Sequence, residues 1–260
     1  MNTNYSINTI SFNAGLTQAL ERKIACTDSY GVQKIQKLIK HEYGTKADFR
    51  GNIVLSRLFL ESLNILRNIS KKFNLPFEIY PPNVNVYNVQ DLNPSMYYAK
   101  GATFGFSQWT KSDVLKNKSK FEPRSIFIKN VEDDAKLFDA EVENHYKDKR
   151  YASDSIFYPF LHELMHNVHQ KLLTDKFGCY ESSSKTREII NAIFSDSERQ
   201  IISNSIGLNA SKSTAELFAD VMSKLICESM DNKNIVIRNP MDALKELPEF
   251  IQKFIKEQLS

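Results

Sequence analysis

The sequence has few cysteines, glycines and prolines and lacks any long apolar run. Its three cysteines, Cys26, Cys179 and Cys227, are too few and too widely spaced for a disulfide framework or a CxxC metal site, so we expect reduced thiols. Eight glycines and eight prolines in 260 residues are about half the usual share, which argues against a loop-rich or solenoid-β protein. With a mean hydropathy of -0.40 and no apolar run of about 18 residues, the sequence predicts no transmembrane helix.

The sequence also has only a small excess of positive over negative charge. The sequence has 34 Lys and Arg against 31 Asp and Glu, which gives a net charge of +3 and a pI near 8.6. A nucleic-acid-binding protein normally carries a denser basic stripe, so we expect no nucleic-acid partner. Residues 1–15 are rich in Ser, Thr and Asn and have neither the basic residues nor the apolar segment of a Sec signal peptide. They predict a flexible N-terminus, or alternatively a leader for another secretion machinery.

The rest of the chain, residues 16–260, predicts a single α+β domain. Apolar residues recur at helical spacing over residues 16–76, and again in several segments of residues 154–260. Between them, residues 77–131 contain short β-type runs, which predict a small mixed sheet. The predicted strands are FEIY (77–80), VNVYNV (84–89), YYAKGATFGF (97–106) and SIFIKNV (125–131). The predicted later helices cover residues 135–146, 156–176, 185–203 and 213–230 and a closing pair split by Pro248.

His162, Glu163 and His166 form the motif HExxH. On a helix, side chains at positions i and i+4 lie on one face about 6 Å apart, so the two imidazoles can share one Zn²⁺ ion. Zinc lowers the pKa of bound water, and Glu163 would take the water proton and return it to the leaving amine. Pro159 is tolerated only near a helix start, so the motif should lie about one turn inside its helix. The nearby His169 is expected to be a partly exposed residue rather than a ligand.

A third zinc ligand has to come from elsewhere in the chain. The metzincin pattern is excluded because the position six residues after His166 holds Leu172 rather than histidine. We favour Glu216 because Asp220 lies one helical turn further on, where it could accept a hydrogen bond from His162. Ser213-x-x-Glu216 also matches a capping box, which would explain the glutamate without a metal. The carboxylates considered are Glu181, Glu188, Glu198, Glu216 and Asp220, with Glu188 as the reserve ligand.

The C-terminal hundred residues resemble the catalytic domain of the anthrax lethal factor family, which includes the clostridial Pro-Pro endopeptidases. The resemblance covers Ile156–Leu259 and rests on HELMHNVHQKLLTDKFG, KTREIINAIF, STAELFADVMSKL and NPMDALKELPEFIQKFI. It implies a zincin-like fold of the gluzincin type. Zinc would be bound by His162, His166 and Glu216, with Glu163 as general base and Asp220 hydrogen-bonded to a ligand.

The sequence departs from this family at one functional position. The family has a tyrosine two helical turns before the ligand glutamate, whose hydroxyl stabilises the developing oxyanion, whereas this chain has Asn209 there. An asparagine amide can donate to an oxyanion but is shorter. Tyr180, His145 and Tyr151 are alternative donors that the sequence does not rank.

The sequence as a whole predicts a zinc-dependent endopeptidase. Its substrate would be a protein or peptide, such as a host signalling protein, bound along an edge strand at Gly101–Phe106 or Ser125–Asn130. The lack of a Sec signal and the reduced cysteines favour a bacterial effector or toxin exported by a specialised secretion system, and together with the resemblance they imply that it acts in a host cytosol. We expect a monomer. The alternative hypothesis is a catalytically inactive zinc-binding module for protein interaction.

Overall fold

The protein has a mixed α+β architecture, as the sequence predicts. A computed structural model describes residues 28–88, 105–108, 124–131, 133–177, 193–231 and 235–260. The predicted flexible N-terminus (residues 1–15) and the start of the predicted helical region (residues 16–27) lie outside these residues. Within them, a small sheet and the helices share one hydrophobic core. None of the described helices is long and apolar enough to span a membrane.

The sheet is small and mixed. Its four strands are β1 (Lys46–Asp48), β2 (Asn83–Tyr87), β3 (Gly105–Gln108) and β4 (Ser125–Lys129). They lie in the order β1-β2-β4-β3; β1, β2 and β4 are parallel, and β3 is antiparallel to β4. The prediction that Ser125–Asn130 is an edge strand is therefore wrong, because β4 has neighbours on both sides. The other candidate, Gly101–Phe106, overlaps β3, which does lie at the edge.

Two strand assignments from the sequence need correction. Residues 77–80 form no strand because prolines 76, 81 and 82 flank them, and prolines lack the N–H that a ladder requires. The Ile79 carbonyl instead accepts a hydrogen bond from the Asn167 amide of a later helix, at 2.8 Å. Conversely, β1 lies inside the region predicted to be helical. It is only three residues long and pairs with β2, a contact that local periodicity does not reveal.

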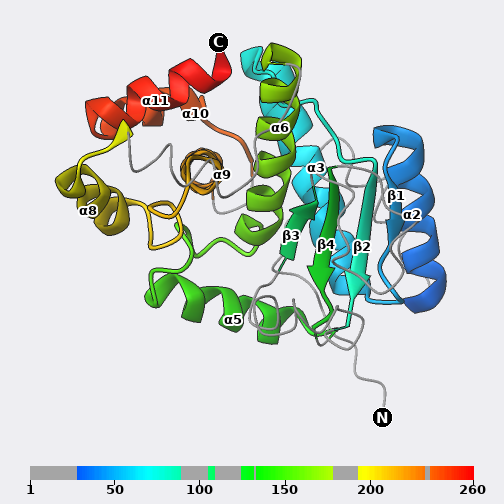
Figure 1. The fold of residues 1–260 in the computed structure, drawn as a ribbon. Coiled ribbons are helices and arrows are strands. Elements are labelled where there is room, and N and C mark those ends of the chain that lie inside the picture. The colour runs from blue at the N-terminus through cyan, green and yellow to red at the C-terminus, as the bar shows by residue number, and fades with distance from the viewer. Residues whose placement is uncertain (1–27, 89–104, 109–123, 132, 178–192, 232–234) are drawn as a thin grey trace.

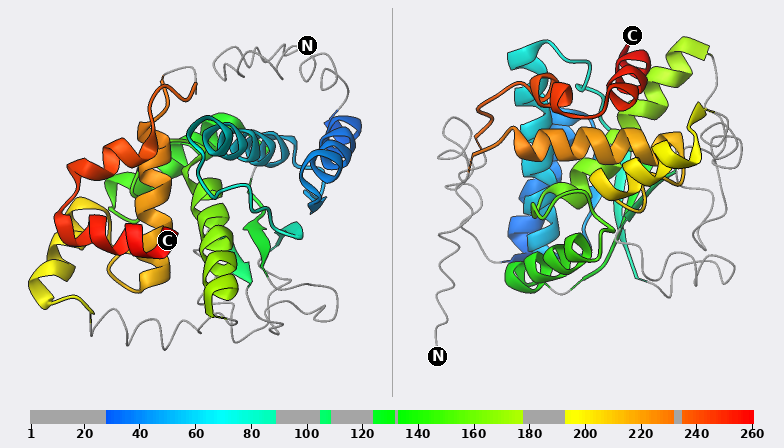
Figure 2. Two further views of the ribbon diagram at one scale, coloured as in Figure 1. Left: turned by 90° about the horizontal axis from the view of Figure 1, so that it is seen from above. Right: turned by 90° about the vertical axis from the view of Figure 1, so that its left-hand side faces the viewer.

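Some helices pack around the sheet, and the others form a second, wholly helical part of the molecule beside it. Figure 1 shows α3 behind the sheet, α2 beside β1, and α6 along the β3 edge. On the far side of α6, α9 is seen end-on, with α8, α10 and α11 beyond it and α5 below. Figure 2 shows α9 from the side, running across the molecule. The helices are α2 (Asp28–Tyr43), α3 (Ile53–Phe73), α5 (Ala135–Lys147), α6 (Tyr158–Phe177), α8 (Asp196–Ser205), α9 (Thr214–Glu228), α10 (Pro240–Ala243) and α11 (Glu249–Leu259).

Helix α6 is the central element of the fold. It contacts the sheet through β3 and β4 and packs against α3, α9 and α11. Leu161, Leu164, Met165 and Val168 are fully buried, which accounts for the strongly apolar sequence of this helix. As predicted, Pro159 is in the first turn, and the HExxH motif follows it one turn into the helix. The helix thus holds the motif where the sheet and the C-terminal helices meet.

Candidate metal centre

The two histidines of the motif lie one above the other on α6. Their Nε2 atoms are 3.0 Å apart, and the ring planes are nearly perpendicular, at 89°. Only 13% of the His162 side chain and 11% of the His166 side chain are exposed. Both rings therefore direct a nitrogen to the same small volume at the edge of the core.

Helix α9 brings Glu216 to the same place. One carboxylate oxygen, Oε2, lies 3.4 Å from His162 Nε2, and the other, Oε1, lies 3.5 Å from His166 Nε2. Ser213 caps α9 by accepting a hydrogen bond from the Glu216 N–H, but the Glu216 side chain turns to the histidines rather than back to the cap. In α8, by contrast, Ser195 and Glu198 form both halves of a capping box. Helix capping therefore does not explain the orientation of the Glu216 carboxylate.

The separations of these donor atoms fit a tetrahedral zinc ion. Zn–N and Zn–O bonds of about 2.0–2.1 Å place two ligands of one tetrahedral ion about 3.3 Å apart. The two Nε2 atoms are 3.0 Å apart, and they lie 3.4 and 3.5 Å from different oxygens of Glu216, distances close to this value. One ligand atom from each of the three residues lies within 4.8 Å of the other two. The Glu216 side chain is 33% exposed, so solvent reaches the cluster from its side. Among the described residues, this is the one group of three His, Cys, Asp or Glu side chains with ligand atoms close enough to hold a metal.

The charges at the cluster are those expected of a cation site. Burial disfavours a charged His162, but the carboxylates of Asp220 and Glu216 outweigh this effect and hold its pKa well above the ordinary value. Burial also disfavours a charged Glu216, yet His166 and His162 hold the pKa of that carboxyl well below its usual range. Glu216 and Asp220 lie one turn apart on α9, and two carboxylates at this spacing repel each other unless a positive charge lies beside them. A cation bound here would supply that charge.

Asp220 lies behind His162, as the sequence predicts. Its Oδ1 atom is 2.7 Å from His162 Nδ1, and only 1% of its side chain is exposed. The same oxygen accepts a hydrogen bond of 2.5 Å from the hydroxyl of Tyr158, which lies one turn before His162 on α6. Burial raises the pKa of Tyr158 well above its ordinary value, so this hydroxyl stays protonated and acts as the donor. Sequence reasoning missed Tyr158, although its spacing of four residues from His162 was visible.

Glu163 is buried next to the cluster, with 6% of its surface exposed. Burial raises the pKa values of Tyr87 and Tyr151, and the Glu163 carboxylate raises both further. The glutamate therefore lies near two tyrosines, one from β2 and one from the loop before α6. It is not one of the three converging ligand side chains.

The residues considered for oxyanion stabilisation lie in different places. The Asn209 amide donates to the Arg150 carbonyl at 3.0 Å, so the structure ties this side chain to the loop after α5. Tyr180 lies outside the described residues. Tyr151 packs between His145 and Tyr158 with tilted rings, whose centroids are 4.9 and 5.1 Å away, and Tyr158 in turn contacts His162. Of these candidates, Tyr151 and His145 thus belong to a row of aromatic rings that leads to His162.

The other carboxylates considered as ligands do not join this cluster. Glu198 caps α8, and Glu181 and Glu188 lie outside the described residues. The expectation for His169 is wrong, because this residue is completely buried rather than partly exposed. Its ring stacks on Phe218 at 4.5 Å, and its Nε2 atom lies 3.0 Å from Gln258 Oε1. His169 thus links α6 to α9 and α11.

Because His169 is buried in neutral form, it should make the protein sensitive to acid. Burial lowers its pKa from 6.5 to about 4. Above pH 6.5 neither the folded nor the unfolded protein protonates it. Between pH 6.5 and 4 only the unfolded chain takes up the proton, so acid removes stability, by at most about 3 kcal/mol. Urea unfolding of the wild type and His169→Phe, with chelator present, should show a smaller loss between pH 7 and 4.5 in the variant. Equal losses would contradict this role.

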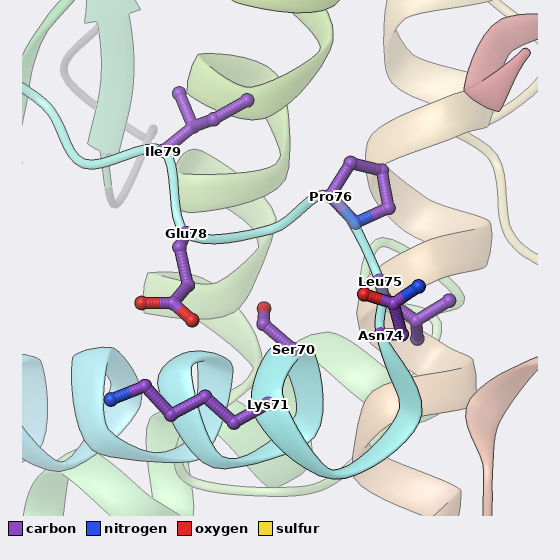
Figure 3. A pocket seen from close by; sticks show the side chains of 7 residues that line it. All are labelled: Ser70, Lys71, Asn74, Leu75, Pro76, Glu78 and Ile79. Carbon is purple, nitrogen blue, oxygen red and sulfur yellow. The ribbon is translucent and has the colours of Figure 1, made fainter.

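A surface hollow of about 440 Å³ lies at the C-terminal end of α3 and the loop that follows. In Figure 3 the side chains of Lys71 and Glu78 flank its opening. The side chains of His162, Glu163, His166 and Glu216 do not line it, so the hollow is separate from the candidate metal centre. The lining residues are Ser70, Lys71, Asn74, Leu75, Pro76, Glu78 and Ile79.

Comparison of the chain with protein-family models, with curated proteins and with solved structures gives no match.

Proposed function

We propose that the protein is a zinc-dependent endopeptidase with a zincin-like catalytic domain. The observation that carries this proposal is the convergence of His162, His166 and Glu216 from two helices, with donor atoms 3.0 to 3.5 Å apart. Two histidines and one glutamate, with a side open to solvent, are the ligand set of catalytic rather than structural zinc sites. The likeness of the HExxH and STAELFAD segments to the lethal factor family supports the same assignment.

The ligand chemistry favours zinc over other common ions. Imidazole nitrogens suit zinc, copper, nickel and iron, whereas magnesium and calcium prefer sites made of oxygen ligands. In structural zinc sites the ion usually has four protein ligands, often cysteines. This cluster has three ligand residues, and none of them is a cysteine. A site of this kind retains one coordination position for water or substrate.

Each side chain at the centre has a distinct role in this proposal. Bound zinc would lower the pKa of water and polarise the scissile carbonyl. Glu163 accepts the proton of the attacking water and passes it to the leaving amine. The Asp220 carboxylate lies 2.7 Å from His162 Nδ1, where it favours a proton on that nitrogen and so leaves the Nε2 lone pair of His162 free for the metal. The burial of Glu163 and Asp220 keeps these two carboxylates in fixed positions.

A protein substrate would bind in extended form along β3. This strand lies at the edge of the sheet and beside α6, so its outer side faces the region of the HExxH helix. No other described strand pairs with that side. An extended peptide can add to such an edge through main-chain hydrogen bonds. The geometry thus favours a polypeptide substrate over a small molecule.

The proposal predicts metal-dependent cleavage of proteins. Purified full-length protein, incubated with a lysate of candidate host cells, should generate new protein N-termini that mass spectrometry can map. A zinc chelator should abolish them, and stoichiometric zinc added after removal of the chelator should restore them. Identical N-termini with and without chelator would indicate a contaminating or metal-independent protease and would contradict the proposal.

A further inference from the structure

We propose that Tyr158 is a positioning residue of the metal centre, which acts on zinc binding through Asp220 and His162. The inference rests on the proposed zinc site and concerns a residue that neither the HExxH motif nor the family resemblance singles out. The three side chains form a continuous series of polar contacts, a hydrogen bond from Tyr158 to Asp220 and an ion pair between Asp220 and His162. The Tyr158 hydroxyl lies 2.5 Å from Asp220 Oδ1, and the same oxygen lies 2.7 Å from His162 Nδ1.

The geometry of Asp220 explains why the Tyr158 hydroxyl matters. The Asp220 side chain is almost completely buried, and its Oδ2 atom has no hydrogen-bond partner among the described residues. The carboxylate is therefore held through Oδ1 alone. Without the Tyr158 hydroxyl, the carboxylate could turn about its side-chain torsion and present either oxygen to His162 Nδ1. The hydrogen bond from Tyr158 to Oδ1 removes this freedom.

Both residues in contact with Asp220 Oδ1 come from α6 and lie one turn apart, at positions 158 and 162. The spacing between them is therefore fixed by the helix. Tyr158 is itself held in place, since its ring is 1% exposed and packs between the rings of Tyr151 and His162. A buried, packed hydroxyl loses little freedom when it forms a hydrogen bond. Tyr158 thus aligns Asp220 so that the carboxylate accepts the Nδ1 proton of His162 and directs Nε2 to the metal.

Zinc affinity of the full chain, measured by competition with a chromophoric chelator, tests this role without any assay of activity. Loss of an outer partner of a metal ligand typically costs about 10- to 100-fold in affinity. Tyr158→Phe, which removes only the hydroxyl, should weaken zinc binding about tenfold. Tyr43→Phe is the matched control, because Tyr43 is also buried and donates its hydroxyl to a side chain, that of Asn64, far from the metal centre. It should leave zinc affinity unchanged.

A double-mutant cycle separates positioning from a general structural effect. Asp220→Ala should weaken zinc binding about 10- to 100-fold. If Tyr158 acts through Asp220, adding Tyr158→Phe to Asp220→Ala should change the affinity by less than about twofold. A further tenfold loss in the double variant would overturn the inference, and so would wild-type affinity of Tyr158→Phe. Absence of zinc binding by the wild type would overturn the proposed metal centre itself, and the inference with it.

Two measurements guard against an effect of misfolding. Urea unfolding of each variant in excess chelator should show a single cooperative transition. Nuclear magnetic resonance of the zinc-loaded wild type needs no variant. It should show His162 protonated at Nδ1 and a Tyr158 hydroxyl proton that exchanges slowly with water. A rapidly exchanging hydroxyl proton would overturn the inference, because a donor held between two packed rings and a buried carboxylate is shielded from solvent.

Discussion

Glu163→Gln is expected to lower kcat/KM for peptide hydrolysis by about 10²- to 10⁴-fold, the usual contribution of a general base. The amide has nearly the shape of the carboxylate but cannot accept the proton of the attacking water. Because Glu163 is not among the converging ligand side chains, the variant should still bind one zinc ion with wild-type affinity. Cleavage of a peptide substrate and the zinc content of the purified protein together measure these two effects.

Glu61→Gln is a matched control for this experiment. Glu61 has the same exposed fraction as Glu163, 6%, but lies on α3 and contacts Asn64 rather than the metal centre. Its replacement should leave kcat/KM unchanged. Activity of Glu163→Gln within a few-fold of the wild type would contradict the assigned role. If neither the wild type nor the variant cleaves any peptide while both bind zinc and the same partner protein, the inactive zinc-binding module is the better description.

Glu216→Ala should nearly abolish zinc binding. The carboxylate lies 3.4 and 3.5 Å from the two histidine Nε2 atoms, so its removal leaves two ligands on one helix. We expect a loss of affinity above the roughly 100-fold upper range for outer partners. Zinc at 100 times its Kd stabilises a protein that binds it only when folded by about 3 kcal/mol. Zinc should therefore raise the Tm of the wild type and leave that of the variant unchanged.

Glu198→Ala is the matched control for Glu216→Ala, because it removes a glutamate from the equivalent position of another helix. Both glutamates occupy the third position after a capping serine, but Glu198 completes its capping box, whereas Glu216 faces the histidines. Glu198→Ala should lower stability slightly and equally with or without zinc, because it removes one half of the capping box, and should retain full zinc affinity. An equal zinc-induced rise in Tm for Glu216→Ala and the wild type would show that Glu216 is not a ligand.

The part of the metal centre that lies within one helix could be predicted from the sequence. The spacing of His162 and His166 places their rings on one face of any α-helix, and Pro159 fixes where that helix begins. Glu216 was harder to predict, because Ser213-x-x-Glu216 is equally consistent with a capping box. Only the packing of α9 against α6 determines where its carboxylate points, and that contact joins segments about fifty residues apart.

Features that depend on contacts between distant segments were missed or wrongly predicted. His169 was expected to be partly exposed, but α9 and α11 cover it. Asn209 occupies the expected position in sequence, yet its amide is bound to the Arg150 carbonyl. The order of the strands could not be predicted from the sequence either, because β1 is very short and β4 pairs with both β2 and β3. Export without a Sec signal and a host substrate stay predictions.

The location of zinc in a crystal tests the central claim most directly. Diffraction data from crystals grown with equimolar zinc, collected on both sides of the zinc absorption edge, would show the ion through its anomalous signal. We predict one strong peak at about 2.0–2.2 Å from His162 Nε2, His166 Nε2 and a carboxylate oxygen of Glu216. A zinc peak bound to other residues, or none in crystals of folded protein, would contradict the account.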